Sequence, residues 1–206
     1  MRVVTIVLSL FWLGQAAALD TIEPFEAGLS DLELYYTGTP SGSHALAGTV
    51  GIGVAPLLNL ALAPEVLYEG NQIAYGLSFQ NIMNVYDGAI ALDFVPGVHT
   101  DFERFGLDLG AELSFPLRGW TPYVQAAFAY ELEPRTSEFG AALGAALAIF
   151  PTGELFLEAG QVWADATAVP RGALGLNVQL ADNMELITEV HYQSSWSGLV
   201  GLIQTL

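Results

Sequence analysis

The sequence predicts an all-β protein, a closed antiparallel up-and-down transmembrane β-barrel of about twelve strands. Three observations predict it: period-two alternation of apolar side chains, turn signals at regular spacing, and an acidic yet hydrophobic composition. The 206 residues carry a formal charge of -17 and are 52% hydrophobic but only 13% charged, whereas ordinary globular proteins are about 25% charged with mixed signs. A barrel that turns its apolar side chains outward and much of its acid inward accommodates both properties.

The first residues predict export. Met1-Arg2 precedes an apolar run over 3–13 and the small triplet Ala16-Ala17-Ala18, the order found in a cleavable signal peptide. We expect residues 1–18 to be removed and residues 19–206 to form the barrel domain. The apolar run is shorter than the roughly 20 residues of a membrane-spanning helix. The chain has no Cys, so disulfides and Cys-ligated metals are excluded.

Alternation with a period of two is seen over 72–80, 104–115, 173–180 and 185–193, and it predicts strands with one apolar face. In segment 104–115, a bulky series alternates with a series of small or polar residues. The bulky series consists of Phe105, Leu107, Leu109, Ala111, Leu113 and Phe115. The opposite series in all four segments is rich in Gly, Ala and polar residues. This favours the inside of a narrow cylinder over a soluble sandwich, whose interior faces are bulky.

Two apolar segments, 45–64 and 139–150, leave a helical alternative open. The first is long enough to span as a helix, and the second contains Gly140-x-x-x-Gly144, a spacing found between packed membrane helices. Strands are favoured because the first contains several Gly residues and divides at Pro56, and the second has only 12 residues. Segment 154–164 is also expected to be a strand, but its alternation does not define which of its two faces points into the barrel.

Turn signals between these segments predict eleven connections and hence twelve strands. Merging the weak turns at Glu69 or Ser194 would give ten or eight strands. The connections are expected at Thr39-Pro40-Ser41-Gly42, Pro56 to Asn59, Glu69-Gly70-Asn71, Tyr86-Asp87-Gly88, His99 to Glu103, Arg118-Gly119, Glu133-Pro134-Arg135, Pro151-Thr152-Gly153, Asp165 to Arg171, Asp182-Asn183 and Ser194-Ser195.

Aromatic residues bracket several of these turns, as in the two girdles of a membrane barrel. Aromatic residues also favour strands in general, which is the simpler explanation. The expected girdle consists of Phe115, Trp120, Tyr130, Phe139, Phe150, Tyr192 and Trp196, with Phe156 facing Phe150 across a turn.

Together these features resemble the bacterial outer-membrane β-barrel superfamily, in the broad porin-like or OmpA-like sense. The resemblance extends over about 27–206 and includes no family-specific motif. It implies a location in the outer membrane, with membrane lipids and lipopolysaccharide as partners. One departure is the C-terminal Leu206, where such proteins commonly carry an aromatic residue.

The face opposite the bulky series collects charged residues and is the candidate site. The expected lumen and selectivity residues are Glu33, Glu65, Asp93, Arg104, Asp108, Glu112, Glu131, Glu185 and Glu189. Glu158 is expected to join them, and His99 and His191 are partial counter-charges. Dry burial of so many carboxylates would be costly, so we expect a hydrated acidic lumen and a passive channel for small cations or small solutes.

Two alternatives to the channel remain open. The first is a non-conducting structural or surface-interaction barrel, with a plugged core in which Arg104 neutralises Asp108. Acidic residues expected on the outer rim could share divalent cations with lipopolysaccharide phosphates, although solvated loop tips are the simpler interpretation; they are Asp101, Glu103, Glu133, Glu138 and Asp165.

The second alternative, a lipid-modifying enzyme, has little support. His191 is followed two residues later by Gln193, where lipid hydrolases of this architecture place Ser, and it falls on the polar face. Asp108 and Glu112 would lie about 13 Å apart along a strand, too far for a glycosidase pair. We expect no catalytic site, no metal and no cofactor. Nucleic-acid binding is excluded by the sign of the charge, and the oligomeric state is left open.

Overall fold

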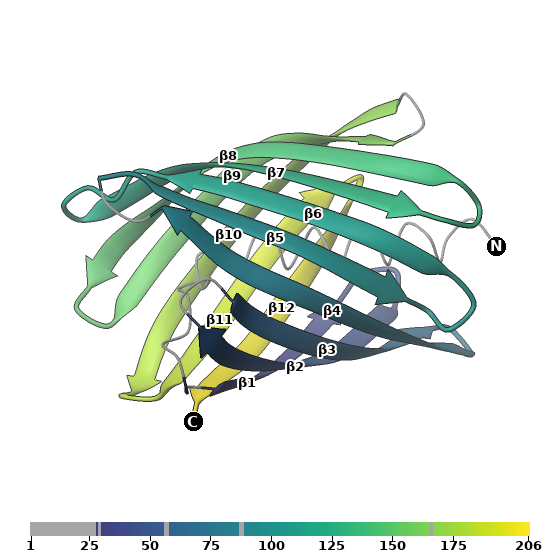
Figure 1. The fold of residues 1–206 in the computed structure, drawn as a ribbon, viewed down its shortest axis with the longest axis horizontal. Coiled ribbons are helices and arrows are strands. Elements are labelled where there is room, and N and C mark those ends of the chain that lie inside the picture. Colours follow the sequence, from purple (N-terminus) through teal and green to yellow (C-terminus); the bar gives the residue numbers. More distant parts are fainter. Residues whose placement is uncertain (1–27, 29, 56–57, 87–88, 165–166) are drawn as a thin grey trace.

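A computed structural model describes residues 28, 30–55, 58–86, 89–164 and 167–206, which form a wall of strands around a central axis (Figure 1). Within these ranges there are twelve strands: β1 (Ser30–Gly38), β2 (Ser43–Ala55), β3 (Leu58–Glu69), β4 (Gln72–Tyr86), β5 (Ala91–Thr100), β6 (Phe105–Ser114), β7 (Trp120–Glu131), β8 (Thr136–Phe150), β9 (Gly153–Ala164), β10 (Thr167–Ala181), β11 (Met184–Gln193) and β12 (Ser195–Thr205).

Each strand pairs antiparallel with the next along the chain, and β12 pairs with β1 to close the barrel. The predicted closed up-and-down barrel of about twelve strands is therefore confirmed, and the ten- and eight-strand alternatives are wrong. Segments 45–64 and 139–150 are strands, so their helical alternative is also wrong. No helix in the described ranges is long and apolar enough to cross a membrane. The predicted signal peptide and the turn residues 56–57, 87–88 and 165–166 lie outside the described residues.

The barrel has two ends, which we name by the chain. The terminal rim is the end where β1 begins and β12 ends, and the distal rim is the opposite end, reached by the β1–β2 hairpin and every second hairpin after it. The connections at both rims are short; residues 39–42, 101–104 and 132–135 lie at the distal rim.

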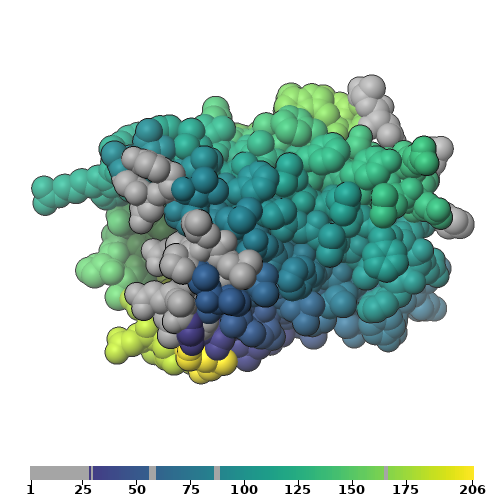
Figure 2. All heavy atoms as spheres, in the orientation of Figure 1, coloured from purple at the N-terminus to yellow at the C-terminus, as the bar shows by residue number. Residues whose placement is uncertain are grey.

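The outward face is apolar on every strand, because bulky side chains occupy alternate positions there. Leu109 at the centre of β6 and Leu143 at the centre of β8 are both exposed, while their chain neighbours Asp108 and Ala142 are buried. Figure 2 shows this outer wall from one side as a continuous surface. A folded chain in water buries such side chains, so the polarity of the barrel is inverted.

Several sequence-based expectations need correction. Phe156 lies on the inward face and is 3% exposed, so it cannot belong to an outer girdle. The expected connection Asp165 to Arg171 ends earlier, because β10 begins at Thr167 and includes Arg171. Glu138 belongs to β8 and not to a loop at the rim. The expected connections Pro56 to Asn59 and His99 to Glu103 are also shorter, because Asn59 belongs to β3 and His99 to β5. Except for Phe156, these corrections arise because the strands extend further than the turn and charge signals indicated.

Phe150 faces outward because of a local irregularity. Simple alternation after Ile149 would turn it inward, but the pairing register of β8 and β9 shifts between Ala148 and Phe150. A β-bulge of this kind adds one residue to one strand and turns the next side chain to the other face.

Candidate functional site

The inward wall of the barrel carries the carboxylates that the sequence predicts for the lumen. All eight lie within strands at inward positions: Glu33 in β1, Glu65 in β3, Asp93 in β5, Asp108 and Glu112 in β6, Glu131 in β7, and Glu185 and Glu189 in β11. Arg104 lies in the β5–β6 connection at the distal rim. The ambiguous Glu158 is buried on the inward face of β9.

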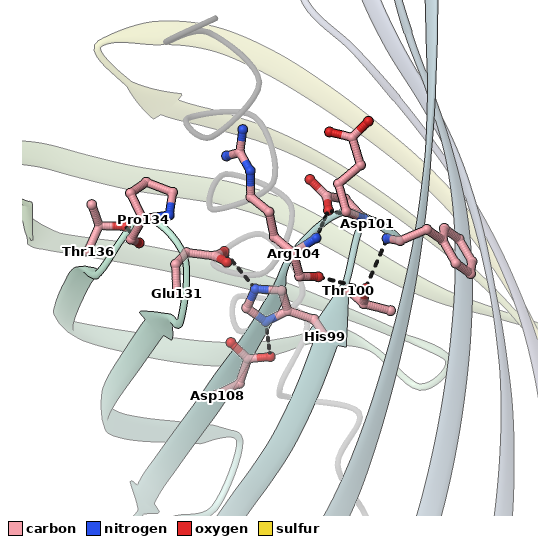
Figure 3. Close-up of polar contacts among 10 residues, drawn as sticks. His99, Thr100, Asp101, Arg104, Asp108, Glu131, Pro134 and Thr136 are labelled. Carbon is pink, nitrogen blue, oxygen red and sulfur yellow. Dashed lines mark hydrogen bonds and ion pairs between the residues drawn. The ribbon is translucent and has the colours of Figure 1, made fainter.

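His99 joins three adjacent strands at the distal end of this wall (Figure 3). Its Nδ1 lies 2.7 Å from Asp108 Oδ2 on β6, and its Nε2 lies 2.8 Å from Glu131 Oε1 on β7. The Asp108 side chain is 0% exposed. His99 is therefore a partner of Asp108, and it supplies positive charge there when the imidazole is protonated.

The hairpin that follows β5 fixes the backbone beside His99. Thr100 Oγ1 accepts a hydrogen bond from the Phe102 N–H and donates one to the Arg104 carbonyl, while Asp101 Oδ1 accepts the N–H groups of Glu103 and Arg104. These bonds satisfy the backbone of a tight turn in which Phe102 has a φ of 67°.

A second charged group lies on β9, β10 and β11. Arg171 on β10 donates a hydrogen bond from Nη2 to Glu158 Oε1 on β9. Both side chains are buried, with exposures of 8% and 0%. His191 Nε2 lies 2.5 Å from Glu189 Oε2 on β11, so that contact is an ion pair when the imidazole is protonated.

Arg171 is the functional candidate that sequence reasoning missed. The sequence predicts a connection from Asp165 to Arg171, but Pro170 and Gly172 fit outward positions of β10 and Arg171 lies between them in the strand. Its position in the alternation, two residues before Ala173, would have placed it on the inward face.

Other inward polar groups bond to neighbouring side chains. Tyr35 O–H donates to Glu33 Oε2 at 3.0 Å, and Asn177 Nδ2 donates to Glu185 Oε2 at 2.9 Å. Several carboxylate oxygens have no hydrogen-bonding partner among the described residues, including Asp31 Oδ1, Glu65 Oε1, Asp108 Oδ1 and Glu158 Oε2. Buried oxygen atoms of this kind call for water or cations.

Inward aromatic rings lie over glycines of the neighbouring strand. Phe156 covers Gly175, Tyr123 covers Gly144 and Tyr35 covers Gly201, and in each pair an added Cβ would overlap the ring. The glycines of the inward series are therefore needed for the close approach of a ring as well as for a narrow cylinder.

Gly175→Val is expected to destabilise the barrel by about 1–3 kcal/mol, because the added side chain overpacks against Phe156. The measurement is urea-induced unfolding of detergent-solubilised protein. Gly198→Val is the matched control, because Gly198 lies in β12 with no atom closer than 3.8 Å to an added Cβ. Equal stability of the two variants would contradict the packing argument.

Each residue of the expected girdle lies near a rim. Trp120 and Phe150 are exposed near the terminal rim, with Phe115 just beyond β6. Near the distal rim, Phe139 is exposed and stacks on Trp163, Tyr192 contacts Trp196, and Tyr130 is half-buried. Further exposed aromatic residues that the sequence analysis did not include extend this set near the distal rim: Tyr36, Tyr68, Tyr75, Phe105 and Trp163. Their role at a membrane interface stays a prediction.

Comparison with solved structures relates this architecture to known proteins. The KdgM porin aligns with a TM-score of 0.68 at 7% identity, over 84% of this chain and 98% of that porin. The COG4313 outer membrane channel from Pseudomonas putida F1 aligns with a TM-score of 0.68 at 11% identity, over 90% and 98% of the two chains. The NanC porin aligns with a TM-score of 0.68 at 9% identity, over 86% and 100%.

The chain has the fold of an outer-membrane β-barrel. Identities this low establish the fold of the barrel and not its solute. No family model and no curated protein sequence matches the chain.

The three structures compared above are two porins and an outer membrane channel. Within the described ranges, no group of three or more His, Asp or Glu residues is arranged to hold a metal ion. The described residues of the inward wall carry charged and hydrogen-bonding side chains.

Proposed function

We propose that this protein is a small outer-membrane channel with an acidic lumen that prefers cations. The observation that supports it is the inverted polarity of the closed barrel: the outward positions are bulky and apolar, and the inward positions collect carboxylates. Lipid is the environment that suits such an outer face, and closure leaves no unpaired strand edge within it. Export by a cleavable leader at residues 1–18 is part of this proposal.

The inward charge supports a hydrated pathway. Arg171 and the imidazoles of His99 and His191 contact some of the inward acids. Several other carboxylate oxygens, such as Asp31 Oδ1 and Glu65 Oε1, have no hydrogen-bonding partner in the part of the chain that the structure describes. Carboxylates are stable as anions when water or mobile cations reach them. A wall of fixed negative charge then concentrates cations and repels anions.

The same charge argues against anionic oligosaccharides as solutes. One of the similar structures is the KdgM porin in complex with disordered oligogalacturonate, a chain of sugar acids. The carboxylates on the inward wall here would repel such a polyanion, so we propose small cationic or neutral solutes instead. Lipid contact and the absence of enzymatic activity belong to the same proposal.

Purified protein reconstituted in planar bilayers is expected to give discrete conductance, and a KCl gradient is expected to give a cation-preferring reversal potential. Glu112→Gln should lower this preference because one inward negative charge is removed. Glu133→Gln, in the exposed β7–β8 connection, is the matched control and should leave it nearly unchanged. Absence of conductance over a wide range of salt concentration would refute the channel and favour the non-conducting barrel.

A further inference from the structure

The contacts of His99 define its charge. Each of its two ring nitrogens lies within 2.8 Å of a different carboxylate oxygen. An ionised carboxylate can only accept hydrogen bonds. When both Asp108 and Glu131 are ionised, both ring nitrogens donate, and His99 is then an imidazolium cation between them.

The strands around His99 are shaped to hold the ring in this position. Gly106 is paired with His99 across β5 and β6, and an added Cβ at Gly106 would overlap the imidazole. Glu131 is paired with the same Gly106 across β6 and β7, so the missing side chain leaves the ring room to reach both acids. Figure 3 shows the imidazole between Asp108 and Glu131, with the Arg104 side chain extending away from it.

We propose that His99 is a selectivity-determining residue of the barrel: as a cation held by Asp108 and Glu131, it limits the preference for cations at the distal end of the lumen. This inference rests on the proposed channel function. Without His99, two carboxylates that now share one imidazolium would face a passing ion as a pair of anions, and a cation would replace the ring as their counter-charge.

Other charged residues lie near the distal rim. Asp101, Glu103 and Arg104 lie in the connection that follows β5, and Glu138 lies on β8 opposite Ala129 of β7. His99 is the residue among them whose side chain joins three strands. Replacing His99 therefore changes the electrostatic field at the inward wall and leaves the charged residues of the distal rim in place.

The test is the cation-to-anion permeability ratio of the full-length barrel in planar bilayers under a KCl gradient at neutral pH. His99→Gln is expected to raise the ratio by about two- to fivefold, the effect of one charge at close range in a hydrated, salt-screened site. Glu131→Gln is expected to lower the ratio. His99→Lys, which keeps a cation between the acids, is expected to stay near the wild-type value.

Opposite shifts of the permeability ratio in His99→Gln and Glu131→Gln distinguish an effect of charge from structural damage. A disrupted barrel wall would change the ratio of both variants in the same direction. His44→Gln is the matched control, because His44 faces outward, where it bonds to the Tyr36 hydroxyl at 2.8 Å. A heat-dependent shift on a detergent gel verifies that each variant forms a barrel. A conducting wild type with His99→Gln at the wild-type ratio would overturn the role of His99 alone. A silent wild type would overturn the channel and, with it, this role.

Discussion

Replacing Arg171 by Gln is expected to destabilise the barrel by about 3–5 kcal/mol, the usual cost of leaving one partner of a buried ion pair uncompensated. The Glu158 side chain is 0% exposed, and its Oε2 has no hydrogen-bonding partner within the described ranges. Its bond to Arg171 therefore contributes much of what stabilises its charge. Without the guanidinium, Glu158 must take up a proton or draw in a cation, and either response reduces the stability of the fold.

The free energy of unfolding in urea, measured in detergent micelles, checks this expectation. The double variant Glu158→Gln/Arg171→Gln is expected to recover most of the lost stability, because it buries no uncompensated charge. The wild type, the two single variants and the double variant together form a double-mutant cycle. Arg118→Gln is the control, because Arg118 is exposed in the β6–β7 connection. A loss at Arg171 no larger than the loss at Arg118 would contradict the assignment of a buried pair.

Leu143→Arg is expected to cost about 2–4 kcal/mol when the barrel is folded into lipid vesicles, the range for a charge at the bilayer midplane on a lipid-facing strand. Leu143 lies at the centre of β8 and is 65% exposed. In water such an exposed position would accept Arg at almost no cost. The size of the loss therefore reports the environment of the outer face.

Leu132→Arg is the matched control for this experiment. Leu132 is 45% exposed but lies in the β7–β8 connection at the distal rim, where water reaches the charge. Folding yield and urea midpoint in vesicles are the measurements. Similar values for the two variants would show that the centre of β8 does not face lipid.

The strand pattern could be predicted from sequence because each strand of a barrel faces the same two environments along its length. The bulky series of 104–115 and 185–193 are found outward in β6 and β11 as predicted. The pattern was ambiguous for 154–164, because the bulky Phe156 and Val162 point inward there together with Glu158. Phe156 is paired with Gly175 of β10, whose missing side chain makes room for the ring. The alternation within one strand contains no information about the residues of its neighbour, so this packing could not be predicted.

The charged site was only partly predictable for the same reason. Alternation places Asp108, Glu131 and Glu158 on one face, but a bond between strands depends on register, which is set by the exact turn positions. Arg171 was missed because Pro170 and Gly172 resemble a turn, although Pro is tolerated here at an outward position of β10. The contacts of His99 depend on Gly106 of β6, a residue without a side chain to signal a role.

The seam between β1 and β12 has a consequence for how the chain must assemble. All the remaining pairs of neighbouring strands are consecutive in the chain, so each pair is joined by a short connection and can form locally. In the seam, by contrast, Asp31 of β1 pairs with Thr205 of β12, which is nearly the whole described chain away. Until that last pairing forms, both strands present unpaired N–H and C=O groups, which hydrocarbon does not tolerate. Insertion and closure of the β1–β12 seam must therefore occur together.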